Sequence, residues 1–392
     1  MNSLSACPVC GSRKITPFLR RDGVPANQNV LMPNPESARA IPRGSLDLVV
    51  CEDCGFIFNR SYDDRIVRYG ESYDNTQDCS SVFQEYLAGL AHQLIWERNV
   101  RESRVVEVGC GKGGFLERLV RAEGARNVGY GFDPSYGGPL VQLEGRLRFE
   151  RRYYDAASAE IEADAVICRH VIEHVPDPNT LLRAIRLALV RSSRPRIFLE
   201  TPCAEWILRH RVVWDFFYEH CSYFTAQSLA TTVELTGFRV DSVRHVFGGQ
   251  YLWLEASLAS ESVRSPKDAL SMPALAKDFA AAEGEMRIAL GHWIRDCVER
   301  KERVAIWGAG AKGVTLANMV DPACQWITCV VDVNPRKQGR YLPGTGHPIV
   351  GYRELPRLGV TAAVLMNPNY RGEVLSLLQA VGIDLQVIDL MN

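Results

Sequence analysis

Two stretches of the chain share one pattern of apolar and polar positions. Residues 104–120, RVVEVGCGKGGFLERLV, have the pattern of an apolar strand, a glycine turn and an amphipathic helix, and VGYGFDPS then reads as a second strand ending at Asp133. From residue 303, RVAIWGAGAKGVTLANMV repeats this order, and ITCVVDVN supplies a second strand ending at Asp332. This alternation predicts an α/β protein with two separate doubly wound, Rossmann-like domains.

The remaining hydrophobic pattern is simpler. The stretch 258–300 contains a polar, proline-containing hinge at 259–273, ASESVRSPKDALSMP, and continues as a long helical pattern that would carry the chain to the second α/β domain. Near the N-terminus, the strand-like run LDLVV leads directly into Cys51. No apolar run reaches the roughly 18 residues of a membrane span.

Composition and charge narrow the class of protein. Of 392 residues, 46% are hydrophobic and 23% are charged, which is typical of a globular protein. The formal net charge of −1 provides no general attraction for nucleic acid or anionic lipid. The first residues, MNSLSACPVCGS, lack the basic flank and apolar core of a signal peptide. We therefore expect a cytoplasmic protein with a small-molecule partner and no nucleic-acid or membrane partner.

Four cysteines form two matched pairs. Cys7 and Cys10 lie in CPVCG, and Cys51 and Cys54 lie in CEDCG, so each CxxC pair is followed by a glycine that can take a tight turn. Two such pairs predict a tetrahedral four-thiolate zinc site, and a redox dithiol is the alternative. Zinc held by four cysteines has no open position for substrate, so its expected role is to stabilise the N-terminal lobe.

The first glycine-rich loop predicts a nucleotide-type ligand. Gly109, Gly111 and Gly113 have no side chains, so their N–H groups can approach a ligand, and Asp133 at the end of the second strand can hold ribose hydroxyls. Because Gly109, Gly111 and Gly114 also satisfy GxGxxG, this spacing alone leaves NAD open.

Two further features favour S-adenosylmethionine (SAM). Glu107 precedes the glycines by two residues, where an acid can offset the positive methionine end of that cofactor. Residues 164–178, DAVICRHVIEHVPDP, read as a later strand running into a turn that contains His174. Together with the glycine loop and Asp133, these features resemble class I SAM-dependent methyltransferases. We interpret the turn at His174 as structural.

The second glycine-rich loop could hold another ligand. Gly308, Gly310 and Gly313 fit GxGxxG, and Lys312 could meet a phosphate at the helix N-terminus. A purely structural Rossmann-like domain is the alternative.

The order of motifs along the whole chain resembles the sugar C-methyltransferases of deoxysugar biosynthesis in secondary metabolism. The features are the double CxxC, the ExGxGxG domain, the aromatic segment WDFFYEHCSYFT at 214–225, and GAGAKG followed by VVDVNPRKQGRYLPG. The resemblance implies a zinc-binding N-terminal domain at 1–75, a SAM-binding methyltransferase domain at 76–257, a helical linker at 258–300 and a Rossmann-like C-terminal domain at 301–392. It also implies methylation at C3 of a nucleotide-linked 4-keto sugar, partly held by Gly308, Gly310 and Lys312.

The aromatic segment is the candidate catalytic segment. Where the family commonly has YHEHxSYF, this chain has Phe217 and Tyr218 in place of the first tyrosine and histidine, followed by the matching Glu219 and His220. A carbon acceptor needs a base, and the reference pKa of histidine, about 6.5, suits that role at neutral pH. We assign His220 as base, Tyr218 as donor to the enolate oxygen, and Glu219 as support, either raising the pKa of His220 or orienting a second group.

Several alternatives remain open at this point. Tyr73, in YGESYDNTQ, is a looser candidate for substrate binding. Glu219 and His220 could instead form a satisfied polar pair in an aromatic core. The enzyme could be a SAM-dependent O- or N-methyltransferase acting on a secondary metabolite or sugar, or a NAD-dependent oxidoreductase. A nucleic-acid-binding protein with scaffolding Rossmann-like folds is the alternative from another class, and the near-neutral charge counts against it.

Overall fold

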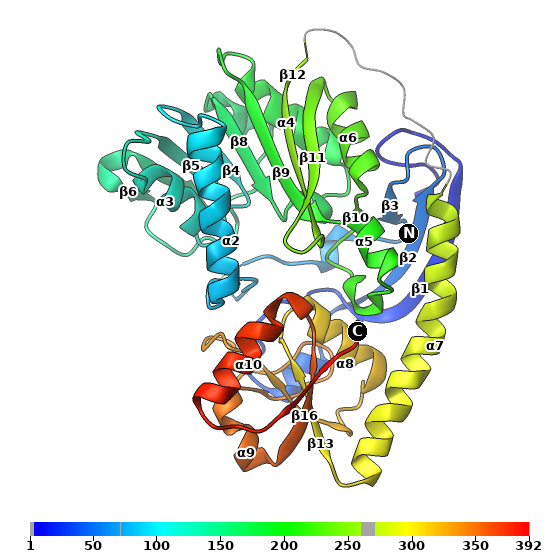
Figure 1. Cartoon of the computed structure of the whole chain (residues 1–392). Coiled ribbons are helices and arrows are strands. Elements are labelled where there is room, and N and C mark those ends of the chain that lie inside the picture. Colours follow the sequence, from blue (N-terminus) through cyan, green and yellow to red (C-terminus); the bar gives the residue numbers. More distant parts are fainter. Residues whose placement is uncertain (1–3, 71, 260–270, 392) are drawn as a thin grey trace.

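The computed structural model describes residues 4–70, 72–259 and 271–391, and its three sheets form an N-terminal lobe, a middle domain and a C-terminal domain (Figure 1). The N-terminal lobe has an antiparallel sheet in the order β1-β2-β3-β10. Its elements are β1 (Ile15–Pro25), α1 (Pro35–Arg39), β2 (Arg43–Cys51), β3 (Ile57–Asn59) and β10 (Ser222–Tyr223). Since β10 comes from the candidate catalytic segment, that segment is part of the lobe's sheet.

The middle domain is built on an eight-stranded sheet in the order β11-β12-β9-β8-β4-β5-β7-β6. Strands β7, β5, β4, β8 and β9 are parallel, and the hairpin β11–β12 adds antiparallel to β9. The strands are β4 (Arg104–Val108), β5 (Val128–Phe132), β6 (Val141–Gln142), β7 (Leu147–Glu150), β8 (Ala165–Arg169), β9 (Arg196–Pro202), β11 (Phe238–Val246) and β12 (Tyr251–Leu258). The helices are α2 (Ser81–His92), α3 (Gly114–Arg121), α4 (Pro178–Leu189), α5 (Ala204–Arg209) and α6 (Ala226–Leu235).

The C-terminal domain has a parallel five-stranded sheet in the order β15-β14-β13-β16-β17. Its elements are β13 (Arg303–Trp307), α8 (Ala311–Val320), β14 (Ile327–Val331), β15 (Ile349–Val350), α9 (Leu355–Leu358), β16 (Val360–Leu365), α10 (Arg371–Ala380) and β17 (Gln386–Asp389). The short helices of the whole chain are η1 (Asp64–Ile66), η2 (Gln93–Glu97), η3 (Leu143–Gly145), η4 (Ala156–Glu160), η5 (Ile172–His174), η6 (Val213–Asp215), η7 (Tyr352–Glu354) and η8 (Pro368–Tyr370). Both glycine-rich loops therefore connect a first strand to a first helix, as the pattern predicted.

The long helix expected after the hinge is α7 (Met272–Glu299). Most of the hinge falls at 260–270, outside the described residues. Helix α7 packs on β1 and β2 of the lobe and on β13 and α8 of the C-terminal domain, and Figure 1 shows it running along one side of both. It therefore connects two parts of the molecule that are far apart in sequence.

One buried apolar cluster extends through all three sheets. It includes Val49 of the lobe, Val166 of the middle domain, Phe279 of α7 and Val304 of the C-terminal domain. No helix in the described part of the chain is long and apolar enough to cross a membrane. The expected α/β architecture of two Rossmann-like domains and a small N-terminal lobe is confirmed, and the shared core packs the three parts together around the site.

Candidate active site

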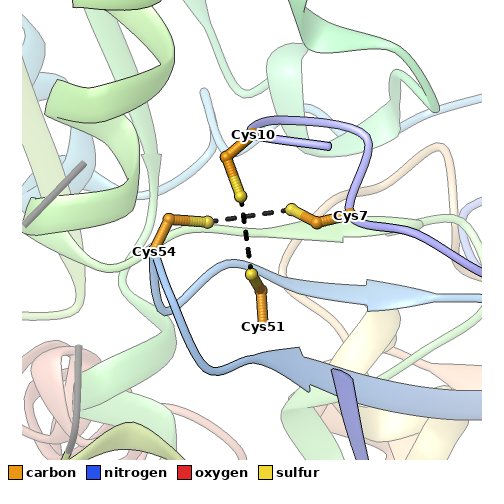
Figure 2. Close-up of side chains that lie close together, drawn as sticks. All are labelled: Cys7, Cys10, Cys51 and Cys54. Atoms are coloured by element: carbon orange, nitrogen blue, oxygen red, sulfur yellow. Dashed lines mark hydrogen bonds between the residues drawn. The ribbon is translucent and has the colours of Figure 1, made fainter. Parts of the chain in front are cut away.

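The four cysteines of the N-terminal lobe meet at one point. Figure 2 shows their Sγ atoms converging, with Cys7 3.7 Å from Cys54 and Cys10 3.6 Å from Cys51. The two knuckles have the same backbone: the N–H of Gly11 donates to the Cys7 carbonyl and that of Gly55 donates to the Cys51 carbonyl. The sulfur separations fit a tetrahedron with zinc–sulfur bonds of about 2.3 Å, whose edges are about 3.8 Å. These residues could therefore hold a zinc ion.

Glu107, at the end of β4, is a buried carboxylate that lacks a full set of partners. Its Oε2 atom has no hydrogen-bond partner in the described part of the chain, and its residue is 3% exposed. Burial raises the pKa of Glu107 to about 8, although the nearby charge of Arg169 opposes that change. A cation bound beside Glu107 would restore the ionised form, so this side chain fits the positive methionine end of SAM.

The glycines of the first loop have different surroundings. Gly109 has a φ of +70°, and an added Cβ would lie 2.0 Å from Cγ2 of Val171. Gly111 has a φ of +55°, and an added Cβ would meet no atom within 4 Å, so the space beside it is open. An added Cβ on Gly113 would instead meet the ring of Phe149 at 2.6 Å. Gly111 therefore faces the open side of the loop, whereas Gly113 allows the loop to pack on an aromatic ring.

Asp133 follows β5 and fixes the same loop. Its Oδ2 accepts from the Gly111 N–H at 2.9 Å, and its Oδ1 accepts from the backbone and hydroxyl of Ser135 at 2.7 and 2.6 Å. Because Oδ2 accepts one hydrogen bond here and can accept a second, these contacts are compatible with the expected ribose contact. The residues present fit SAM at this edge of the sheet.

Glu219 and His220 lie in a turn rather than a strand. The Glu219 carboxylate accepts from the backbone N–H of Gln28 and, at 2.6 Å, from the hydroxyl of Tyr73. It also accepts from the N–H of Asn29 at 3.4 Å. Glu219 therefore connects the aromatic segment to Tyr73 and to the backbone of the N-terminal lobe. The structure thus brings together three candidate site residues: Tyr73, Glu219 and the adjacent His220.

His220 is almost fully buried, and its Nδ1 has no hydrogen-bond partner among the residues that the structure describes. The ring packs on Phe217 at 4.1 Å and on His174 at 4.6 Å between centroids. Burial lowers the pKa of His220 well below its usual value, and the nearby cationic forms of His174, His170 and Lys312 lower it further. Of the two roles expected for Glu219, raising the pKa of His220 was wrong, because that pKa is lowered and the carboxylate contacts the Tyr73 hydroxyl instead.

His174 and Tyr69 extend the cluster. The Nδ1 of His174 lies 2.8 Å from the Tyr69 hydroxyl and 3.0 Å from the carbonyl oxygen of Glu219. Because a carbonyl only accepts, the contact with Glu219 requires a protonated Nδ1. His174 thus holds the backbone of the candidate catalytic segment, in agreement with a structural role for its turn, while its ring also contacts His220.

Tyr218 points to a different region. Its hydroxyl accepts from the backbone N–H of Asp63 at 2.8 Å and lies 3.4 Å from the Asp63 carbonyl oxygen. An added Cβ on Gly44 would lie 2.2 Å from the Tyr218 ring, so this ring occupies a tight space in the N-terminal lobe. The structure does not bring the Tyr218 hydroxyl to the cluster of Tyr73, Glu219 and His220.

The second glycine-rich loop has the tight turn of a Rossmann fold, but the acid that follows its second strand is paired with a lysine of the same domain. An added Cβ on Gly313 would lie 2.0 Å from the Gly308 carbonyl oxygen. Asp332 accepts from the Ala309 N–H at 2.9 Å and lies 3.6 Å from Nζ of the buried Lys337. The chain's own lysine therefore neutralises the carboxylate that would bind a dinucleotide ribose.

Lys312 lies at the boundary between domains. Its Nζ is 2.9 Å from Oδ2 of Asp215 and donates to Oε1 of Gln250 at 3.4 Å. The ring of Trp206 lies 5.6 Å away. Gly310, two residues earlier, faces Asn29, whose Oδ1 would lie 3.9 Å from an added Cβ. The loop thus reaches both the middle domain and the N-terminal lobe.

Two family models match the chain. A methyltransferase domain model covers residues 82–243, and a C-methyltransferase C-terminal domain model covers residues 256–384. The C-methyltransferase NovU of Streptomyces niveus is 26% identical over 365 residues, spanning 88% of this chain and 85% of that protein. The similarity therefore includes all three parts of the fold.

Other relatives match only part of the chain. A ubiquinone biosynthesis O-methyltransferase of Pseudomonas fluorescens (strain SBW25) is 36% identical over 92 residues, covering 22% of this chain and 39% of that protein. The solved structure of 1,6-didemethyltoxoflavin-N1-methyltransferase of Burkholderia thailandensis, with bound S-adenosylhomocysteine, gives a TM-score of 0.34 at 18% identity. It covers 47% of this chain and 83% of that chain, and a score this low adds nothing to the assignment. With two matching domain models and a relative along most of its length, the chain is a SAM-dependent methyltransferase that is similar to C-methyltransferases from its N-terminal lobe to its C-terminal domain.

Proposed function

We propose that this methyltransferase places a methyl group on the carbon next to the ketone of a nucleotide-linked keto sugar. The observation that carries the proposal is the Nδ1 of the buried His220, which has no hydrogen-bond partner among the described residues and lies beside a tyrosine–glutamate pair. Transfer to carbon requires removal of a C–H proton, whereas many oxygen and nitrogen acceptors already have an available lone pair. The relative that matches most of this chain is named a C-methyltransferase, which supports the same chemistry.

His220 is the proposed base. Because burial lowers its pKa, the imidazole is neutral at neutral pH and can accept a proton at Nδ1. It takes the proton from the carbon beside the ketone, and the electrons of the broken C–H bond form the enolate. SAM, when bound beside Glu107 and Gly111, would supply the methyl group for this carbon, and breaking its S–CH3 bond would leave the neutral thioether.

Tyr73 takes the proposed role of donor to the enolate oxygen, in place of Tyr218. Its hydroxyl is held 2.6 Å from Glu219, within the cluster, whereas that of Tyr218 is bonded to Asp63. As charge develops on the sugar oxygen, the Tyr73 hydroxyl can turn to donate to it. Glu219 retains the backbone N–H groups of Gln28 and Asn29 as donors when Tyr73 turns. Glu219 therefore acts by orienting Tyr73.

The acceptor is proposed to lie between the Tyr73 cluster and the loop of Gly308 and Gly310. The connection runs through Asn29, whose Nδ2 lies 3.5 Å from the Tyr73 hydroxyl and whose Oδ1 faces Gly310. Helix α8 begins directly after Gly310, and the backbone N–H groups at its N-terminus suit the phosphates of a nucleotide. The ketone end would then lie at His220 and the nucleotide end at the C-terminal domain.

The activity can be tested directly with labelled methyl donor. We expect the protein to transfer label to a nucleotide-linked 4-keto sugar and not to the matched 4-hydroxy sugar, because only the ketone acidifies the neighbouring C–H bond. Mass spectrometry and NMR of the product should show a methyl group on carbon. A product methylated on oxygen or nitrogen, or equal transfer to the alcohol, would overturn the proposal and support a heteroatom methyltransferase.

Glu107 predicts a pH dependence of SAM binding. In the free protein its pKa is about 8, so between pH 6 and 8 a proton must leave before the carboxylate can face the cation. SAM affinity should therefore rise with pH across this range, and Glu107→Gln should weaken binding at pH 8.5 by about 10- to 100-fold. Calorimetry would measure both effects and the released proton.

Matched variants separate this effect from the titration of SAM itself. Glu117→Gln, which alters a partly exposed carboxylate of α3, should keep the wild-type affinity and its pH slope. Glu107→Gln should reduce that slope. If Glu107→Gln bound SAM with wild-type affinity at every pH, Glu107 would not face the cation.

Zinc at the four cysteines is proposed to be structural. Four thiolates complete the tetrahedron, so the ion would have no open position for an acceptor. The site lies in the N-terminal lobe, where it connects the loop of Cys7 and Cys10 to the end of β2. Its contribution would be to hold the lobe that supplies Tyr73, Gln28 and Asn29 to the active site.

A further inference from the structure

The segment that carries His220 is held from two different parts of the molecule. From the N-terminal lobe, the buried Arg21 of β1 donates to the carbonyl oxygens of Val213 at 2.7 Å and Phe216 at 3.2 Å. Glu283 of α7 accepts from Arg21 at 3.2 Å. Two carbonyls on either side of Asp215 are therefore fixed by one guanidinium group.

The C-terminal domain holds Asp215, which lies between Val213 and Phe216 in the sequence. Lys312 of α8 pairs with Asp215 at 2.9 Å, with side chains 19% and 10% exposed. Helix α8 packs on η6, the short helix that contains Asp215. Among the described residues this is the one ion pair between the glycine-rich loop of the C-terminal domain and the catalytic segment.

The surroundings of Lys312 fix its position further. Gln250, which accepts from Lys312, exchanges two hydrogen bonds with Asn367 of the C-terminal domain, at 2.8 and 3.1 Å. Asn369 donates to the carbonyl of Phe247 in the same β11–β12 turn at 2.8 Å. The loop of the C-terminal domain is therefore built against the middle domain, and the ammonium group of Lys312 lies inside that contact.

Resting on the proposed function, we propose that Lys312 is a positioning residue: through its ion pair with Asp215, the C-terminal domain sets the position of His220. Asp215 precedes His220 by five residues, and the turn between them is closed by the Tyr223 hydroxyl, which contacts both the N–H and the carbonyl of Phe217 at 3.0 and 2.9 Å. A change at Asp215 is therefore transmitted to the imidazole through a short, closed piece of backbone. The charge of Lys312 also helps to keep His220 neutral.

This assignment differs from direct phosphate binding by Lys312, and a pair of variants separates the two. If Lys312 acts through Asp215, Lys312→Met and Asp215→Asn should both lower kcat by about 10- to 100-fold, because small errors in placement have effects of that size. The KM for the nucleotide sugar should change little in either variant. If Lys312 binds phosphate, Lys312→Met should raise that KM while Asp215→Asn leaves it unchanged, and that result would overturn the proposal.

Hydrogen exchange provides a measurement that does not depend on methyl transfer. In the full-length protein without acceptor, peptides covering 213–224 should exchange at least about tenfold faster in both variants than in the wild type. Lys312→Arg should restore slow exchange because it keeps the positive charge. Arg209→Met, which breaks a solvent-exposed pair with Glu205 on α5, should leave exchange unchanged. Wild-type exchange at 213–224 in Lys312→Met and Asp215→Asn would overturn the proposal, even if the acceptor proved not to be a keto sugar.

Discussion

Replacing His220 with alanine is expected to lower kcat by about 10²- to 10⁴-fold, the range of a general base. SAM affinity should remain that of the wild type, because the groups that fit SAM are Glu107, Gly111 and Asp133 at the ends of β4 and β5. His292→Ala, which removes an exposed histidine of α7, is the matched control and should retain full turnover. Turnover within a few-fold of the wild type in His220→Ala would remove the base assignment.

Deuterium exchange tests the same step before methyl transfer. In D₂O without SAM, the wild type should exchange the hydrogen on the carbon beside the ketone, since proton removal does not require the methyl donor. His220→Ala should lose this exchange, while Tyr73→Phe should slow it by weakening enolate stabilisation. Exchange at the wild-type rate in His220→Ala would show that another group takes the proton.

The pH profile should reflect the buried state of His220. Its pKa is held well below 6.5, so the neutral base persists as pH falls through that value and is lost only at more acid pH. With SAM saturating, turnover should therefore stay level from pH 8 to below 6.5. Saturation matters because Glu107 titrates near pH 8 in the free protein and affects SAM binding in the same range.

Features that depend on local spacing could be predicted from the sequence. The two CxxCG knuckles, the strand before Gly109 and the acid after β5 each lie within a few residues of their partners, and the structure has them as expected. Glu219 and His220 were identified because they are adjacent in one motif. The same reasoning from neighbouring positions also predicted Tyr218 as the donor. Successive side chains in a turn point in different directions, and the Tyr218 hydroxyl contacts Asp63 instead.

Contacts between distant segments could not be predicted in this way. Gln28 and Asn29 reach Glu219 across 191 and 190 residues, and no local pattern marks them as partners of a carboxylate. Tyr69 approaches His174 in the same manner, across 105 residues. The GxGxxG spacing likewise could not predict the ion pair between Lys312 and Asp215, because that contact depends on how two domains pack.

Loss of the proposed zinc ion is expected to have the largest effect on stability. Cys51→Ser should remove zinc and lower the free energy of unfolding by on the order of 5 kcal/mol or more, since zinc binding to such sites contributes folding free energy directly. Metal analysis should find about one zinc per chain in the wild type and in Cys79→Ser, which alters an exposed cysteine outside the site. Thermal unfolding with and without a strong chelator would measure the loss of stability.

Loss of zinc should also lower methyl transfer, because the sheet of the N-terminal lobe is connected to the segment that carries His220. Cys51 ends β2, β2 pairs with β3, and β3 pairs with β10, which begins two residues after His220. Gln28, Asn29 and Tyr73, which surround Glu219, come from the same N-terminal part of the chain. Cys51→Ser should therefore lose methyl transfer while the separate sheet edge at Glu107 retains SAM binding. A metal-free protein with wild-type stability and turnover would show that the four thiols alone hold the lobe.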